Sequence, residues 1–454
     1  MMRFVSLAVL CISTLAALAA PPDKPNILLI VADDLGWADV GWHGSRFKTP
    51  ALDALVKTGL ELDRHYVQPV CSPTRTALLT GRWTSRFGPH VLAPTNLRAF
   101  PPGTTTLASA LKECGYTTSL SGKWHLGSKA EWGPNHCGFD HSYGSMTGAV
   151  DPWTHQYRKG PYQNTWHRDL KVIEEEGNAT ELVTADAVNR IKSAKGPWFV
   201  YVPFQAVHIP VDAPEQYKKL YDGVKFDDAP AKDDSLRRFA AFVSQMDAKV
   251  GELVKAVDDK GERARTLIVF TSDNGGLHGG KNPYVGKVAD SPVLSSNLPL
   301  RGQKNTLYEG GVRVCALANW PGTLKPGKST APMHAADWMP TITKLAGWPK
   351  AGEAKFDGQD MWPVLTGIAQ PTPRTVYIPM KASSAVLHDG WKLIARNGAA
   401  APMPELYNVT EDPSEKKNLA AENPDKLKEM TALLAELRKD DLTALPADLK
   451  AVPD

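Results

Sequence analysis

A cysteine stands where a short helix is predicted to begin. Ser72 is a good N-cap, Pro73 suits the first helical position, and Gly81 can adopt the left-handed turn that ends a helix. Cys71 is therefore expected just outside a helix N-terminus. Free N–H groups, the helix dipole and Arg75 one turn further on favour an anionic group or a thiolate there. The alternative interpretation is a buried, small apolar side chain in front of a structural helix.

Acidic and amide side chains follow two apolar, β-branched runs, residues 25–32 and 266–271. Both runs are predicted to be buried strands. In α/β sheets the chemistry gathers beyond the carboxyl ends of the strands, which is where these side chains fall. They supply hard oxygen ligands of the type that bind calcium, namely Asp33, Asp34, Asp273 and Asn274. A hydrogen-bonded structural cluster is the alternative interpretation.

Basic side chains follow other predicted strands and loops. Alternation along an extended segment places Lys123 and His125 on the same face, just after the predicted strand 116–121. His208 follows the predicted strand 198–205, and Lys304 lies in a polar loop. Each is unremarkable alone, because a lone Lys-x-His is most often a surface pair and a histidine near a proline is usually a packed loop residue.

Two of these stretches carry a family resemblance. The sequence Cys-x-Pro-x-Arg at 71–75, followed by Thr-Gly-Arg at 80–82, and the sequence Gly-Lys-Trp-His-x-Gly at 122–127 resemble the signatures of the type I sulfatases. The resemblance implies that a formylglycine-generating or sulfatase-maturating enzyme oxidises Cys71 to formylglycine, whose hydrate is the nucleophile. A serine that attacked sulfur would remain as a stable sulfate ester, whereas a geminal diol can collapse back to the aldehyde and expel sulfate.

The same resemblance implies one divalent cation, usually calcium, per chain. Its ligands would be the formylglycine oxygen at position 71 together with the four residues Asp33, Asp34, Asp273 and Asn274. Such an ion polarises a sulfate oxygen and lowers the pKa of the aldehyde hydrate.

The resemblance also implies roles for the basic residues. Lys123 would contact sulfate and the formylglycine, and His125 would hold one hydroxyl and act as the base that breaks the sulfated intermediate. Together with Arg75, the residues Lys123, His208 and Lys304 would surround sulfate with cationic donors and offset the charge that builds on oxygen. The proton for the leaving alkoxide is assigned to His208, with Lys304 as the alternative.

The closer resemblance is to the arylsulfatase B-like branch, the N-acetylgalactosamine-4-sulfatases and related polysaccharide sulfatases. It rests on stretches that include residues 32–41, 273–276 and 300–304. It implies that the substrate is an O-sulfated galactose or N-acetylgalactosamine unit of a sulfated polysaccharide or oligosaccharide. Thr74 departs from the serine of many members in the cysteine motif, but it keeps the hydroxyl.

The segment 148–168 holds an unusual density of aromatic and ionic side chains. Aromatic faces pack against sugar rings, carboxylates bind hydroxyls, and arginine can hold a second sulfate or a uronate. This segment is therefore expected to bind the glycan through Asp151, Trp153, His155 and Arg168. A solvated surface loop with a few anchoring aromatic residues is the alternative.

Two other functions compete with a sulfate-ester hydrolase. A phosphodiesterase or phosphonate monoester hydrolase of the same superfamily is the nearest enzymatic rival. A sulfated-glycan-binding protein without catalysis is the rival from another class. It is disfavoured because every expected catalytic position is filled.

The elements that must position these residues alternate between helix and strand. Helices are predicted at 50–59, 106–115 and 236–260, among the strands already named. This order predicts an α/β sandwich with helices on both faces of a mainly parallel or mixed sheet. Short strands and an amphipathic helix then predict a small α+β C-terminal domain with an antiparallel sheet. The resemblance implies an alkaline-phosphatase-like catalytic domain at 20–370, followed by this domain at 371–454.

Composition bears on compartment and partners. Residues 1–19 have a charged start, an apolar middle and a small-residue end, which is typical of a cleavable signal peptide. No later apolar run is long enough to span a membrane. A secreted or periplasmic protein is therefore expected. The formal net charge of +3 favours neither nucleic acid nor an anionic membrane as a partner.

Cysteine usage leaves little room for disulfide bonds. With Cys71 committed to chemistry and the signal peptide removed, three cysteines remain, so at most one disulfide can form. Cys114 and Cys137 are the pair nearest in sequence, but three structural thiols, including Cys315, are the expected outcome.

Overall fold

The computed structural model describes residues 24–398 and 403–454, so the predicted signal peptide lies outside the described residues. A large mixed sheet forms the centre of the molecule. Its ten strands are β1 (Asn26–Ala32), β2 (Leu60–Leu62), β4 (Thr117–Lys123), β5 (His141–Ser145), β6 (Trp166–Arg168), β7 (Lys171–Val172), β8 (Trp198–Pro203), β9 (Thr266–Ser272), β13 (Ala316–Asn319) and β14 (Gly327–Ser329). Their order is β14-β2-β13-β9-β1-β8-β4-β5-β6-β7. The central run from β9 to β5 is parallel, and antiparallel pairs flank it.

Strand β1 shows why the sheet is buried on both faces. Because alternate side chains of a strand point to opposite faces, Ile27, Leu29 and Val31 join one hydrophobic core, while the residues between them join the other. The parallel register with β9 places Ala32 beside Ser272. The two predicted apolar strands are therefore confirmed as neighbours, and the acidic residues that follow them emerge at the same edge of the sheet.

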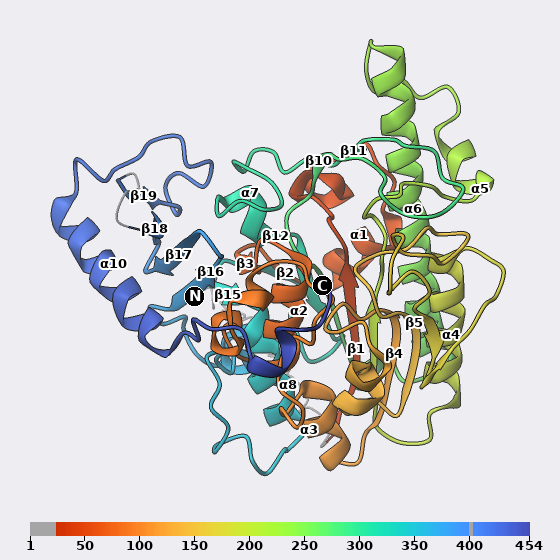
Figure 1. Ribbon diagram of the computed structural model, residues 1–454, viewed down its shortest axis with the longest axis horizontal. Coiled ribbons are helices and arrows are strands. Elements are labelled where there is room, and N and C mark those ends of the chain that lie inside the picture. The colour runs from red at the N-terminus through yellow and green to blue at the C-terminus, as the bar shows by residue number, and fades with distance from the viewer. Residues whose placement is uncertain (1–23, 399–402) are drawn as a thin grey trace, which may run out of the picture.

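Helices pack on each face of this sheet (Figure 1). One core includes residues of α2 (Cys71–Thr80), α3 (Leu107–Glu113) and α8 (Trp338–Leu345), and the other includes residues of α1 (Pro50–Thr58), α4 (Ala179–Ser193) and α6 (Pro230–Asp259). Shorter helices are α5 (Glu215–Lys218), α7 (Glu309–Val312) and α9 (Trp362–Leu365). The predicted helix at 236–260 begins earlier, at Pro230, since a proline in the first turn costs no helical hydrogen bond. The predicted α/β sandwich is confirmed.

Three smaller sheets complete the fold. One consists of β3 (His65–Tyr66), β12 (Arg313–Val314) and β15 (Met333–His334), and a second pairs β10 (His278–Gly279) with β11 (Val293–Leu294). The third is the predicted C-terminal antiparallel sheet of β16 (Thr375–Pro379), β17 (Ser383–His388), β18 (Trp391–Arg396) and β19 (Glu405–Asn408). Helix α10 (Pro424–Leu437) packs on this sheet.

The predicted turn between β17 and β18 is confirmed. Asp389 and Gly390 have φ of 47° and 79°, the left-handed conformation that a tight two-residue hairpin of this kind requires.

A buried ionic group joins the C-terminal sheet to the catalytic domain. Lys392 Nζ on β18 lies 3.0 Å from Glu309 Oε1 and 2.9 Å from Glu415 Oε1, and all three side chains are fully buried. Removing one member of such a group would leave an uncompensated buried charge, so the group resists separation of the two domains.

The last residues of the chain return to the catalytic domain. After α10, Leu442 N donates to Ser85 O at 2.9 Å, and Tyr162 Oη donates to Pro453 O at 2.8 Å. Asp448 pairs with Arg98. The segment 442–454, which the sequence assigned with the C-terminal domain, thus lies against the catalytic domain, and its end is near the middle of the molecule in Figure 1.

The cysteines of the described residues are all free, as expected: Cys71, Cys114, Cys137 and Cys315. Within residues 24–398 and 403–454, no helix combines the length and the apolar character needed to cross a bilayer.

Candidate active site

A pocket of about 500 Å³ opens beyond the carboxyl ends of the central parallel strands. Four of the predicted catalytic residues line it, and they come from different parts of the fold. Cys71 lies at the start of α2, His125 follows β4, His208 follows β8, and Lys304 lies in the loop before α7. The fold therefore brings together side chains that are far apart in the sequence.

Helix α2 begins at Cys71, two residues earlier than expected. Val70 before it is extended, with φ of −152° and ψ of 160°. The prediction that Ser72 caps the helix is wrong, because the Ser72 hydroxyl accepts a hydrogen bond from Thr95 N at 3.4 Å instead. Pro73 is tolerated because N–H groups in the first turn have no partner within the helix. Gly81 ends the helix in the left-handed conformation, with φ of 68°, as predicted.

The threonine of the cysteine motif fixes the chain in front of the helix. The Thr74 hydroxyl accepts from Gln68 N and donates to Gln68 O, both at 3.0 Å. These bonds join the turn before Cys71 to the first turn of α2. A serine at this position could make the same two bonds, so the hydroxyl and not the methyl group holds the motif in place.

The environment of Cys71 differs from the expected one. Burial raises the pKa of the Cys71 thiol, and the nearby Lys123 and Lys304 ammonium groups do not offset this effect. The prediction that this position favours a thiolate is therefore wrong, since burial outweighs the two cations. A protonated thiol is a weak nucleophile.

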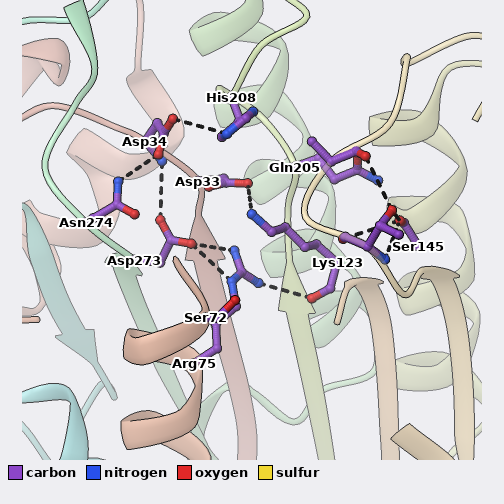
Figure 2. Close-up of polar contacts among 12 residues, drawn as sticks. Asp33, Asp34, Ser72, Arg75, Lys123, Ser145, Gln205, His208, Asp273 and Asn274 are labelled. Carbon is purple, nitrogen blue, oxygen red and sulfur yellow. Dashed lines mark hydrogen bonds and ion pairs between the residues drawn. The ribbon is translucent and has the colours of Figure 1, made fainter. Parts of the chain in front are cut away.

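Two fully buried ion pairs lie at the carboxyl ends of the central strands (Figure 2). Lys123 Nζ donates to Asp33 Oδ2 at 2.6 Å, and Arg75 donates to Asp273 Oδ2 at 3.1 Å from Nε and 2.7 Å from Nη2. Arg75 Nη1 also donates to Lys123 O at 3.1 Å, so one guanidinium joins α2 to the ends of β4 and β9. Burial raises the pKa of Asp33 to about 7, with help from the Asp273 carboxylate and even with Lys123 beside it.

Asp34, the second carboxylate of the acidic pair, contacts the residues on the other side of the site. Asp34 Oδ1 accepts from Asn274 Nδ2 and from Lys304 Nζ, both at 2.7 Å, and Asp34 Oδ2 lies 3.6 Å from His208 Nε2. Burial alone would raise the pKa of Asp34, but Lys304 and His208 hold it at about 2. Asp34 therefore stays ionised.

The donor set fits a divalent cation. Two acceptor oxygens at the strand ends, Asp33 Oδ1 and Asn274 Oδ1, are buried without a hydrogen-bond partner among the described residues. Ligand atoms of Asp33, Cys71 and Asp273 lie within 4.8 Å of one another, as do those of Asp33, Asp34 and His208. Unpaired buried oxygens are costly, and a hard cation such as calcium would satisfy them.

Both histidines of the pocket are held in defined positions. His125 has a left-handed backbone, with φ of 56°, and its Nδ1 has no hydrogen-bond partner among the described residues. Burial, together with Lys123, holds the pKa of His125 well below its ordinary value. His208 Nδ1 donates to Ile209 O at 2.7 Å, and burial and Lys304 lower the pKa of His208 to about 3. This bond fixes the ring so that Nε2 faces Asp34 Oδ2 at 3.6 Å.

The predicted cationic residues divide into two layers. Lys304 and the two histidines line the pocket, whereas Arg75 and Lys123 lie below it. All three cations are engaged by carboxylates. In this arrangement Arg75 positions Asp273, and it does not line the space where a sulfate would bind.

The four residues predicted to bind the glycan do not line this pocket. Asp151 is fully buried, and its carboxylate accepts from backbone N–H groups. Trp153 Nε1 donates to Asp212 Oδ2 at 2.8 Å, and His155 stacks on Trp166 with its Nε2 3.0 Å from Gly177 O. Arg168 pairs with Asp186 at 3.1 Å. These contacts engage all four side chains within the protein, while Trp153 and His155 also line a second pocket. Their role in binding the glycan stays a prediction.

Other residues of the same segment form the pocket wall, and the sequence prediction passed over them. Tyr157, Arg158 and Tyr162 line the pocket, with Tyr284 from a distant loop and Asp454 from the end of the described chain. The aromatic and ionic density of 148–168 was the signal that could have identified the first three. Nothing local in the sequence marks the last two.

Comparisons with known proteins agree with this geometry. The sulfatase family profile matches residues 25–348. Arylsulfatase J of Mus musculus is 30% identical over 491 residues, covering 94% of this chain and 77% of its own. N-acetylgalactosamine-6-sulfatase of Canis lupus familiaris is 31% identical over 79% of this chain and 69% of its own. A crystal structure of Ps i-CgsB in complex with k-i-k-neocarrahexaose superposes with a TM-score of 0.79 at 30% identity, covering 95% of this chain and 98% of that one.

The fold and the site therefore define an alkaline-phosphatase-like hydrolase. The chain belongs to the sulfatase family and is a type I sulfatase, a sulfuric ester hydrolase.

The close packing around His125 yields a test of its position. A Cβ added at Gly148 would lie 2.6 Å from His125 Cε1 and 2.7 Å from Nε2, so Gly148→Ala must displace the imidazole ring. Because misplacing a catalytic group by about 1 Å can cost on the order of 100-fold, we expect a loss of kcat on that scale with little change in Tm. Gly196→Ala, whose Cβ meets open space, is the control. Unchanged turnover in Gly148→Ala would show that the ring position is not needed.

Proposed function

We propose that this sulfatase removes an O-sulfate from galactose or N-acetylgalactosamine units of a sulfated polysaccharide or oligosaccharide. The observation that carries the proposal is the position of Cys71 in a pocket shared with His125, His208 and Lys304, directly above the buried carboxylates. The similarity to an N-acetylgalactosamine-6-sulfatase and to a protein crystallised with a neocarrahexaose supports this class of substrate.

The proposal includes two groups that the chain must acquire. A formylglycine-generating or sulfatase-maturating enzyme would convert Cys71 to formylglycine, which fits the poor nucleophilicity of the buried thiol. One calcium ion would be held by that residue together with Asp33, Asp34, Asp273 and Asn274. When bound, the ion would neutralise charge on the sulfate. The hydrated aldehyde would supply the oxygen that attacks sulfur.

The side chains of the pocket would bind sulfate and move protons. Lys304 presents a positive charge at the pocket wall, where it offsets charge on the sulfate oxygens. Lys123 places a second charge just below, and Arg75 fixes both Asp273 and the backbone of Lys123. Neutral His125, with Nδ1 unpaired in the described structure, can accept a proton.

We also propose that residues 1–19 act as a cleavable signal peptide and that the enzyme works in the periplasm or outside the cell. The pocket opens to the surface of the protein, where a large glycan chain can reach it. Because the formal net charge is only +3, attraction of an anionic substrate must come from the cationic side chains clustered at the pocket.

The function is tested with a panel of esters and protein made in a host that installs formylglycine. We expect sulfate release from oligosaccharides that carry 4-O- or 6-O-sulfate on galactose or N-acetylgalactosamine, and much slower turnover of a phosphodiester and a phosphonate monoester. Cys71→Ser should release almost no sulfate, because serine cannot form the geminal diol. Peptide mass spectrometry of the wild type, which should show an aldehyde at position 71, is the control for maturation.

Two outcomes of this panel would contradict the proposal. Faster turnover of the phosphorus esters would favour the phosphodiesterase or phosphonate hydrolase alternative. Glycan binding without sulfate release, by protein with confirmed formylglycine, would favour the non-catalytic binding protein.

The calcium site is tested by a readout that does not depend on activity. Calcium should raise the Tm of the wild-type protein and EDTA should reverse the rise, because a ligand that binds only the folded state stabilises it. Asp33→Asn should lose most of this shift, since it weakens one of the ligands. Asp39→Asn is the matched control, because Asp39 is equally buried but its oxygens already accept from Ser295, Ser296 and Gly36. An equal calcium shift in both variants would remove Asp33 from the ligand set.

The proton donor is tested by changing the leaving group. A sugar alkoxide needs a proton as it leaves, whereas a nitrophenolate does not. If His208 donates that proton, His208→Ala should lower kcat/KM on a sugar sulfate at least about tenfold more than on nitrophenyl sulfate. Lys304→Ala should then show nearly equal losses on both esters. The reverse pattern would assign the proton to Lys304 and contradict the prediction for His208.

A further inference from the structure

The rim of the active-site pocket carries an arginine on an aromatic support. The guanidinium carbon of Arg158 lies 5.4 Å from the ring centroid of Tyr157 and 5.5 Å from that of Tyr284. The centroids of the two rings are 5.7 Å apart and the rings are tilted by 57° to each other. The guanidinium therefore lies over both rings at once. Among the described residues, no carboxylate forms an ion pair with Arg158, which is exposed and lines the pocket.

Contacts within the protein hold this support in place. Val285 N donates to Tyr157 O, and the Thr154 hydroxyl donates to Val285 O, both at 3.0 Å. The buried carboxylate of Asp151 accepts from the N–H groups of Lys287 and Val288 at 3.1 and 3.2 Å. Two loops from distant parts of the chain are thereby tied together, and each supplies one tyrosine.

Gly286 makes this close approach of the two loops feasible. A Cβ at that position would lie 2.0 Å from Asp151 Oδ2. The carboxylate thus reaches the backbone of the second loop only because residue 286 has no side chain.

The aromatic support is connected to the reacting groups. Tyr284 also packs edge-on against His208, with centroids 6.2 Å apart and an interplanar angle of 76°. Arg158 and His208 therefore both lie against one tyrosine ring, along the wall of a single pocket. A ligand that placed a sulfate near Cys71 would share this pocket with Arg158.

The charges of the rim favour an anion. Lys159 follows Arg158 along the pocket wall. Among the described lining residues, Asp454 alone has an acidic side chain, and its Oδ1 accepts from the Thr95 hydroxyl at 2.9 Å and from Asn96 N at 2.5 Å. The anion-binding capacity of Arg158 is therefore not used within the described protein.

We propose that Arg158, held on Tyr157 and Tyr284, binds a second anionic group of the glycan, on the sugar next to the one that loses its sulfate. This inference rests on the proposed function of the same pocket. Guanidinium presents two parallel N–H donors that match the paired oxygens of a sulfate ester or a uronate carboxylate, and the aromatic faces keep it oriented. The enzyme would then prefer a polyanionic chain to a glycan with a single isolated sulfate.

The test is a ratio of specificity constants. Wild type and Arg158→Ala are compared on an oligosaccharide with only the target sulfate, on one with a second sulfate on the adjacent sugar, and on one with an adjacent uronate. We expect Arg158→Ala to lower the ratio of kcat/KM on the second or third substrate to that on the first by roughly 10- to 100-fold. The substrate whose ratio falls identifies the anion as sulfate or carboxylate. Arg158→Lys, which keeps the charge but loses the two-pronged geometry, should give an intermediate ratio.

Arg46→Ala is the matched control. Arg46 is also exposed and lies 4.7 Å from an aromatic centroid, that of Phe226, but it is not among the pocket residues. Its ratios should equal those of the wild type.

Two results would overturn the inference. Equal losses on all three substrates would mean that Arg158 supports Tyr284 and His208 structurally, and unchanged ratios would mean that no anion binds there. If the wild type, with formylglycine confirmed, hydrolyses none of the three, the proposed function fails. In that case the inference is still decided by calorimetry, which measures binding of the same oligosaccharides to Cys71→Ala protein with and without Arg158→Ala. Tighter binding of the dianionic glycans that is lost with Arg158→Ala supports the inference. Equal affinity for the monoanionic and dianionic glycans overturns it.

Discussion

The ion pair between Arg75 and Asp273 is the interaction on which the site depends. Its two side chains have no solvent exposure, and through the carbonyl of Lys123 the same guanidinium holds the end of a third element. A buried pair of this kind contributes little net stability compared with apolar packing, but losing one partner is costly. Its value here is positional, because it sets the start of α2, the end of β9 and the end of β4 relative to one another. The cysteine, the metal-binding oxygens and the lysine beneath them follow from that arrangement.

Sequence reasoning succeeded where local pattern and tertiary role coincide. The strands β1 and β9 are uninterrupted apolar runs, and such runs have few alternatives to a position in the middle of a parallel sheet. The acidic residues that follow them had to meet at one edge. The hairpin at Asp389 and Gly390 was similarly predictable, because few residue pairs adopt the backbone that a two-residue turn requires. The residues that meet at Cys71 were found because the two short motifs are specific.

The errors have a common cause in long-range contacts that compete with local preference. Ser72 has the chemistry of a helix cap, but Thr95 lies close enough to donate to its hydroxyl. Asp151 stays a predicted sugar ligand, yet its carboxylate binds the backbone of residues more than a hundred positions away. Composition revealed that the segment around it was special. It did not reveal which side chains point toward the pocket and which hold the loops together, since that depends on where the loop of Tyr284 lies.

The burial of α2 has a consequence for the order of events during biosynthesis. All ten residues from Cys71 to Thr80 are buried, and Arg75 within them is locked to two strands. A separate enzyme that must bind this segment as a peptide substrate cannot reach it once the protein has folded. The proposed conversion of Cys71 must therefore take place on the extended chain, during or soon after translation. The competing rates of modification and folding would then set the fraction of molecules that become active, and a molecule that folds first would remain a well-formed but inert protein.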